Sequence, residues 1–356
     1  MIARITHDPL VQRWRTLIFK RNARPTLKEL HLLYGVWIAA FAFKLIGSSW
    51  DVAWHFRYLR DDFAPPHLIN TFGFLVAIAL LMAQSVNGLG TVRRGLRLLQ
   101  IGTGCFLLAI PLDLINHRLF GLDLTSWSPT HMLLYVGTGM MIAGVLRSWL
   151  VVGKASPYRL PFALAFWAFL LEDVIFPTGQ QEYGTLALDA YIHGRTTASN
   201  ELLTRAGDNV TRFVLGSLPP WLYPVWIILG GALVLAAARQ VLGFRWTATT
   251  IAASYVLYRI IAFGVLVAAH FPPSSIPFTL LGVAVVVDLA ASWKLGSLLT
   301  AIAIVVVTYG VALLVEQLTL MPGFPLMAAP FICVGLIAIL AIGGWNRRPT
   351  DAVVAT

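Results

Sequence analysis

The stretch from Trp50 to Gly73 reads WDVAWHFRYLRDDFAPPHLINTFG and joins the end of one apolar run to the start of the next. It carries Asp51 and His55 four positions apart, then a short polar turn, then His67 directly after two prolines. Asp and His at positions i and i+4 lie on the same face of a helix, one turn apart. A short turn brings the next helix back beside the first, so we expect the three side chains to face one point.

A second version of this pattern follows from Leu112 to Gly137 as LDLINHRLFGLDLTSWSPTHMLLYVG, with Asp113, His117 and His131. The two copies are 62 positions apart at Asp, 62 at the first His and 64 at the second His. A repeat at nearly constant spacing indicates a chain built from repeated helical hairpins. The sequence leaves open whether the two copies form two separate sites or share one.

One carboxylate and two imidazoles from two adjacent helices make a ligand set for a transition metal, because imidazole binds copper, zinc and iron well. A structural alternative exists, since such residues also cap helix ends, hydrogen-bond each other or meet water at the membrane edge. Ser128 and Pro129, for example, are a helix start signal that needs no metal. The repetition favours a metal or functional polar site, because ionisable groups in membrane segments are costly and usually functional.

The composition identifies the class of protein. Of 356 residues, 58% are hydrophobic and only 12% are charged, which is typical of an all-α polytopic integral membrane protein. The two cysteines imply no disulfide framework, and the net charge of +10 is spread over short loops, so it indicates orientation and not nucleic-acid binding. The hydropathy predicts about ten spans, near residues 31–56, 67–86, 98–119, 130–151, 160–177, 219–239, 247–270, 275–293, 296–317 and 326–345.

These spans pair into five hairpins and divide the chain into segments. The predicted order is a basic N-terminal segment (1–29), hairpins with the repeated motif (30–177), a long polar loop (178–217), C-terminal helices (218–346) and a short tail (347–356). The loops on the side of the N-terminus are basic, so the positive-inside rule predicts that both termini are cytoplasmic, in a bacterial inner (plasma) membrane. The motif turns then lie on the outer side. Residues 9–21 are expected either to form an amphipathic helix on the inner leaflet or to be a disordered basic tail.

Other ionisable residues sit in or beside the spans. Glu172 and Asp173 end the fifth span and His270 ends the seventh, so they are additional candidate ligands at matching ends of later hairpins. Lys44 lies inside the first span and requires a partner or a path to the membrane surface. Lys44, Arg259 and Asp288 are expected to pair within the bundle.

The run D-x-x-W-H-x-x-x-x-R-D-x-F-x-P-x-H, which starts at Asp51 and ends at His67, resembles the C subunit of the copper membrane monooxygenases. These are the particulate methane and ammonia monooxygenases. The resemblance implies that Asp51, His55 and His67 bind copper within the membrane. It also implies that the protein takes part in oxidising a small apolar substrate with O₂. The second copy lacks the Trp-His and Arg-Asp pairs of this run.

We therefore expect a metal-binding membrane protein, first of all a copper-dependent monooxygenase, with zinc or iron as alternative metals. The expected metal ligands are Asp51, His55, His67, Asp113, His117 and His131, and no catalytic residue is assigned. No haem, flavin or iron–sulfur motif is present, so electrons would come from a partner subunit or a quinol. Two alternatives remain: a non-enzymatic protein that handles or transports a metal, and a structural subunit whose polar residues only cap helices. The expected surroundings are the lipid bilayer, without nucleic acid.

Overall fold

The computed structural model describes residues 9–20, 24–58, 63–120, 128–195, 198–205 and 219–345. The N-terminal residues 1–8, the motif residues Arg60 and Asp61, part of the long loop (206–218) and the predicted tail lie outside this part of the chain, as does the side chain of His117. Within the described ranges the protein is all-α, with thirteen α-helices. The predicted fold class of a helical polytopic membrane protein is confirmed at this level.

Eight of the described helices are long and apolar enough to cross a membrane. They are α3 (Leu27–His55), α4 (Pro65–Asn87), α5 (Arg93–Phe120), α6 (Pro129–Val152), α7 (Arg159–Phe176), α10 (Leu222–Leu242), α11 (Thr247–Ala268) and α13 (Ser297–Glu316). The two other predicted spans form shorter apolar helices, α12 (Thr279–Trp293) and α14 (Ala329–Ile342). Their exposed apolar side chains, with those of the eight long helices, imply contact with lipid.

Prolines explain why these two helices are short. The segment before α12 contains Pro272, Pro273 and Pro277 and is not helical, so α12 begins at Thr279 and not at the expected residue 275. A helix of 15 residues is about 22 Å long, less than the roughly 30 Å of a hydrocarbon core. Before α14 the chain forms a 3₁₀ turn, η3 (Leu326–Ala328).

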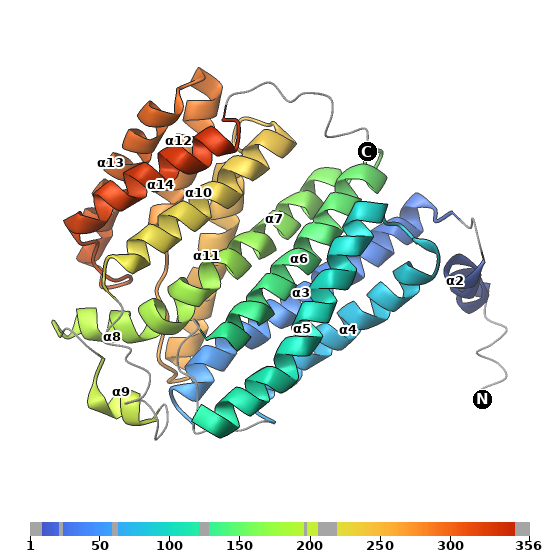
Figure 1. Ribbon diagram of the computed structural model, residues 1–356, viewed down its shortest axis with the longest axis horizontal. Coiled ribbons are helices and arrows are strands. Elements are labelled where there is room, and N and C mark those ends of the chain that lie inside the picture. The colour runs from blue at the N-terminus through green and yellow to red at the C-terminus, as the bar shows by residue number, and fades with distance from the viewer. Residues whose placement is uncertain are drawn as a thin grey trace.

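Each of the five predicted helix pairs packs together: α3 with α4, α5 with α6, α7 with α10, α11 with α12, and α13 with α14. Figure 1 shows α3 to α7 side by side in one group and α10 to α14 in another. Helix α7 joins the groups, because it contacts α3 and α6 in the first and α10 and α11 in the second.

The described part of the long connection contains three short helices, η1 (Pro177–Leu186, a π-helix), α8 (Ala187–Ile192) and α9 (Asn200–Arg205). This segment covers the end of the bundle at which the first motif lies. Leu186 and Ala198 form a small core with Val52 of α3 and with Phe56, the residue that follows His55. The connection therefore helps to cover this end of the bundle.

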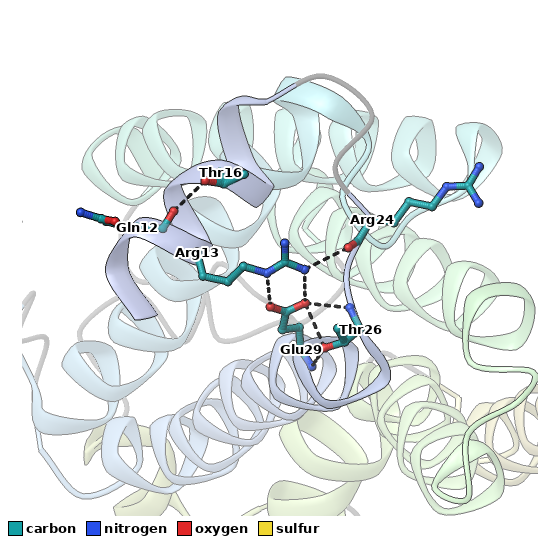
Figure 2. Close-up of polar contacts among 6 residues, drawn as sticks. All are labelled: Gln12, Arg13, Thr16, Arg24, Thr26 and Glu29. Carbon is teal, nitrogen blue, oxygen red and sulfur yellow. Dashed lines mark hydrogen bonds and ion pairs between the residues drawn. The ribbon is translucent and has the colours of Figure 1, made fainter. Parts of the chain in front are cut away.

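The basic N-terminal segment forms helix α2 (Pro9–Phe19). A helix was one of the two alternatives predicted for this segment. Figure 2 shows how it is held: Arg13 donates to both carboxylate oxygens of Glu29, at 2.7 and 3.0 Å, and also to the carbonyl oxygen of Arg24. Glu29 in turn accepts from Thr26, the N-cap of α3, so one carboxylate serves both the helix start and the docking of α2. Leu17 completes the contact and is fully buried.

Two buried charges of the C-terminal group have structural partners. Asp288 of α12 accepts hydrogen bonds from the backbone of Ala248 and Thr249 at the start of α11, and its carboxylate lies 3.3 Å from Arg239. Arg259 donates to Ser274. The expected pairing among Lys44, Arg259 and Asp288 is therefore not what the structure shows, because Asp288 caps the start of α11 beside Arg239, and Lys44 donates to Asn70.

Candidate metal centre

The first motif is positioned by one helix end and one helix start. Asp51 and His55 occupy the last turns of α3, which ends at His55. Pro65 and Pro66 fill the first positions of α4, where a missing N–H costs nothing, and His67 follows in the first helical turn. The i, i+4 spacing and the proline start thus place the three side chains at adjacent helix ends, as the sequence predicted.

The three side chains converge on one point. Nε2 of His67 lies 2.8 Å from Oδ1 of Asp51, and Nε2 of His55 lies 3.4 Å from the same oxygen. The two imidazole nitrogens are 3.2 Å apart. In the described part of the chain, this is the group of three or more His, Cys, Asp or Glu side chains whose donor atoms lie close enough to hold one metal ion.

The spacing of these donor atoms fits a transition metal. Metal–ligand bonds of about 2.0–2.1 Å put neighbouring donor atoms about 2.9 Å apart at octahedral angles and about 3.3 Å apart at tetrahedral angles. The three observed separations run from 2.8 to 3.4 Å, so both geometries are within reach of small movements. Nδ1 of His55 is buried and has no hydrogen-bond partner among the described residues, so packing orients this ring.

Two glycines allow α3 and α4 to approach closely enough for this arrangement. A Cβ atom on Gly47 would lie 2.7 Å from the backbone nitrogen of Asn70 and 2.9 Å from the carbonyl oxygen of Pro66. A Cβ atom on Gly73 would lie 2.6 Å from the carbonyl oxygen of Ala40. Small residues at helix contacts are how membrane helices pack backbone against backbone. Gly47 therefore packs against the turn of α4 that carries His67.

The second motif forms a pair in the described structure. Nε2 of His131 lies 3.5 Å from Oδ1 of Asp113, and the hydroxyl of Thr130 donates to the same oxygen at 2.7 Å. Ser128 caps α6 by accepting from the backbone N–H of His131, which confirms the predicted start signal. His117 lies within α5, but its side chain is outside the described part, so its predicted role as a ligand stays a prediction.

Both motifs line one cavity of about 540 Å³ between α3, α4, α5, α6 and α7. Its wall includes the first triad, the pair Asp113 and His131, and the additional candidates Glu172 and Asp173. The described residues of the two copies therefore face a shared space, while the number of metal sites that they form stays a prediction. His270 is exposed at the end of α11 and is not part of this wall.

Several cavity residues were not recognised as site residues from the sequence. Asn70 accepts a hydrogen bond from Lys44 at 3.2 Å, and the Lys44 ammonium lies 3.9 Å from the centre of the Phe106 ring. One signal was available: Lys44, Ser48, Asp51 and His55 follow the i, i+4, i+7, i+11 spacing of one helix face. This face of α3 is the polar side of the cavity.

No protein-family model, curated protein or solved structure matches this chain. The resemblance of the Asp51–His67 run to the copper membrane monooxygenases therefore stays a prediction.

Proposed function

We propose that this protein is a membrane metalloenzyme in which Asp51, His55 and His67 bind a transition-metal ion, copper first, for oxidation of a small, mostly apolar molecule with O₂. The observation that carries the proposal is the convergence of three donor atoms within 2.8–3.4 Å of one another on the wall of a cavity inside a helical membrane protein. The family resemblance of the same three residues supports copper.

Three protein ligands leave part of the metal's coordination sphere open, as in catalytic sites and unlike closed structural sites. Bound there, the metal would supply the redox chemistry that activates O₂. Two imidazoles and one carboxylate are also the ligand set of non-haem iron(II) oxygenases, so iron is the first alternative to copper. The protein residues hold the ion at one end of the cavity.

The cavity supplies the conditions for such chemistry. Its wall includes the rings of Phe41, Phe56, Phe74, Phe106 and Phe169, which offer an apolar surface to a small molecule beside the triad. The short helices of the long connection cover the same end of the bundle, which further shields the triad.

The alternative of metal transport is less well supported. A carrier for a cation needs ligands that continue across the bilayer. Two turns along α3 from Asp51, the same face presents the ammonium group of Lys44, which opposes passage of a positive ion. The ammonium group of Lys44 therefore favours a metal ion that stays bound at the triad over one that passes along the cavity.

Metal content tests the proposal directly. Full-length protein in lipid nanodiscs, produced with copper, iron and zinc all present, would be compared with His55→Ala and His67→Ala variants by mass spectrometry. His193→Ala, an exposed histidine of the long connection, is the matched control. We expect about one copper ion per chain in the wild type and the control, and its loss in both motif variants.

Electron paramagnetic resonance of the copper form should then show coupling to imidazole nitrogen. Iron in place of copper would redirect the substrate assays to iron(II) oxygenase chemistry. Zinc alone would overturn the redox proposal. A metal-free wild type under these conditions would leave the structural-subunit alternative as the better account.

A further inference from the structure

Helix α2 lies away from the metal cavity, at the far ends of the two helices that carry the first motif. Asn87, the last residue of α4, donates to the carbonyl oxygens of Leu17 and Lys20 at the C-terminal end of α2, at 2.5 and 3.4 Å. Arg13 of α2 pairs with Glu29, which caps the start of α3. Helix α2 is thus fixed to both helices of this hairpin.

This docked helix has a second, outward apolar side. Leu17 is fully buried, and Trp14 and Ile18 pack beside it against the bundle. Val11 and Phe19 are 42% and 69% exposed, and their i, i+8 spacing places them on one side of the helix. In Figure 1, α2 is seen nearly along its axis while α3 to α7 run across the picture, so α2 lies crosswise to them. A crosswise helix with an outward apolar side is typical of a helix in the interface of a bilayer.

Four exposed cations accompany this outward side: Arg15, Lys20, Arg24 and Lys28. In the described part of the chain none of these four side chains forms an ion pair. The one acidic residue from position 9 to position 29 is Glu29, and Arg13 already pairs with it. Figure 2 shows the Arg24 side chain pointing away from that pair. This segment therefore presents positive charge that no carboxylate of its own compensates.

We propose that α2 and residues 24–28 form a binding surface for the headgroups of anionic phospholipids, such as phosphatidylglycerol, in the leaflet on the side of the N-terminus. Val11 and Phe19 enter the apolar edge of that leaflet, and the four cations lie at the level of the lipid phosphates. The proposal is independent of the proposed metal chemistry.

Charge complementarity selects this partner. A Lys or Arg near an anionic membrane surface strengthens binding about fivefold, and arginine also binds phosphate oxygens in pairs. A zwitterionic lipid carries its own positive group next to the phosphate, so it gains less from unpaired cations. An acidic soluble protein would meet the charges, but the short connection from Phe19 to the start of α3 at Leu27 keeps α2 at the membrane surface.

The test counts bound lipid. Full-length protein in micelles of a neutral detergent would be titrated with phosphatidylglycerol and, separately, with phosphatidylcholine, and the bound lipids would be counted by native mass spectrometry. We expect the wild type to bind phosphatidylglycerol at least about tenfold more tightly than phosphatidylcholine, because several unpaired cations meet the headgroup.

Variants assign this preference to α2. Arg15→Gln/Lys20→Gln removes two of the four cations and should weaken phosphatidylglycerol binding by about 25-fold, or about fivefold for each charge. The matched control is Arg245→Gln/Lys294→Gln, which removes the same charge from exposed residues of the loops after α10 and α12. The positive-inside rule places these loops on the same side, and the control should bind like the wild type. Phe19→Ser should weaken the binding of both lipids by a similar factor, because it removes apolar contact and no charge.

Equal affinity of the wild type for the two lipids would overturn the proposal. So would a wild-type preference in Arg15→Gln/Lys20→Gln that circular dichroism shows to be folded. An equal loss in the control variant would assign the effect to total charge and remove α2 as the binding surface. None of these measurements requires a metal, so the metal-content experiment can succeed or fail independently of them.

Discussion

Replacement of Gly47 by alanine should weaken metal binding without touching any ligand. The added Cβ atom would lie 2.7 Å from the nitrogen of Asn70 and 2.9 Å from the oxygen of Pro66, and ordinary contact starts at 3.4 Å. Both contacted atoms are backbone and cannot rotate away, so the first turn of α4 must move back by about 0.5–0.7 Å, a strain typical of overpacking. His67 lies within that turn, between the two contacted residues.

This displacement is large on the scale of a metal site. Distances in a metal centre hold to within about 0.2 Å, so moving one ligand of three by more than twice that amount lowers affinity. We expect a loss of about 10- to 100-fold, comparable to the loss of a supporting residue around a metal. The overpacked helix contact should also reduce the free energy of unfolding by about 1–3 kcal/mol.

The assay is competition for copper between the protein in nanodiscs and a chromophoric chelator, with thermal unfolding measured on the same samples. Gly35→Ala on the same helix is the matched control, because a Cβ atom at that position meets nothing within 4 Å. Alanine there should leave metal affinity unchanged and raise helix stability slightly. Wild-type affinity in a folded Gly47→Ala variant, or an equal loss in Gly35→Ala, would refute the reasoning.

Three further predictions concern other parts of the molecule. Burial raises the pKa of Tyr191 to about 12, whereas the phenol ionises at about pH 10 in the unfolded chain. The free energy of unfolding should therefore fall between about pH 10 and pH 12. In an alkaline unfolding titration, Tyr191→Phe should not show this loss. Arg13→Gln removes the pair with Glu29 and should expose α2 to protease in nanodiscs, whereas unchanged cleavage would show that α2 is held by its apolar contact alone. Asp288→Ala removes the carboxylate beside Arg239 and the cap of α11. It should reduce the free energy of unfolding by about 3 kcal/mol in a denaturant titration. A loss below about 1 kcal/mol would contradict the structural role of Asp288.

The sequence predicted the first motif because its geometry is local. The i, i+4 spacing of Asp51 and His55 and the start of α4 at Pro65 depend only on helix periodicity and proline chemistry, and the structure contains both. The same holds for Ser128, whose capping role needs only the next three residues. Such features can be read from a short window of sequence.

The shared cavity could not be predicted in this way, because it depends on contacts between helices far apart in the chain. The partner of Lys44 is Asn70, on the next helix, and Asp173 comes from a third helix more than a hundred residues later. Glycines such as Gly47 and Gly73 decide how closely neighbouring helices approach, but a glycine in an apolar run does not reveal which backbone it will meet. The start of α12 was predicted too early for a different reason. Hydropathy does not include the effect of the prolines before Thr279, which keep that segment from being helical.

The two motif copies differ in where their first helix ends and in the number of residues between their histidines. Helix α3 ends at His55, whereas α5 continues for three residues beyond His117 to Phe120. The stretch between the two histidines is also two residues longer in the second copy, which is why their repeat distance is 64 and not 62.

The described donor atoms of the two copies are also arranged differently. The first copy brings its three donors within 3.4 Å of one another, while the described donors of the second copy, Asp113 and His131, are 3.5 Å apart and share a carboxylate oxygen with Thr130. A hydroxyl that donates to the carboxylate competes with a metal for the same lone pairs. Among the described residues, the first copy is thus the group whose three donor atoms lie close enough to hold one ion, and Asp113 and His131 add polar groups to the wall of the same cavity.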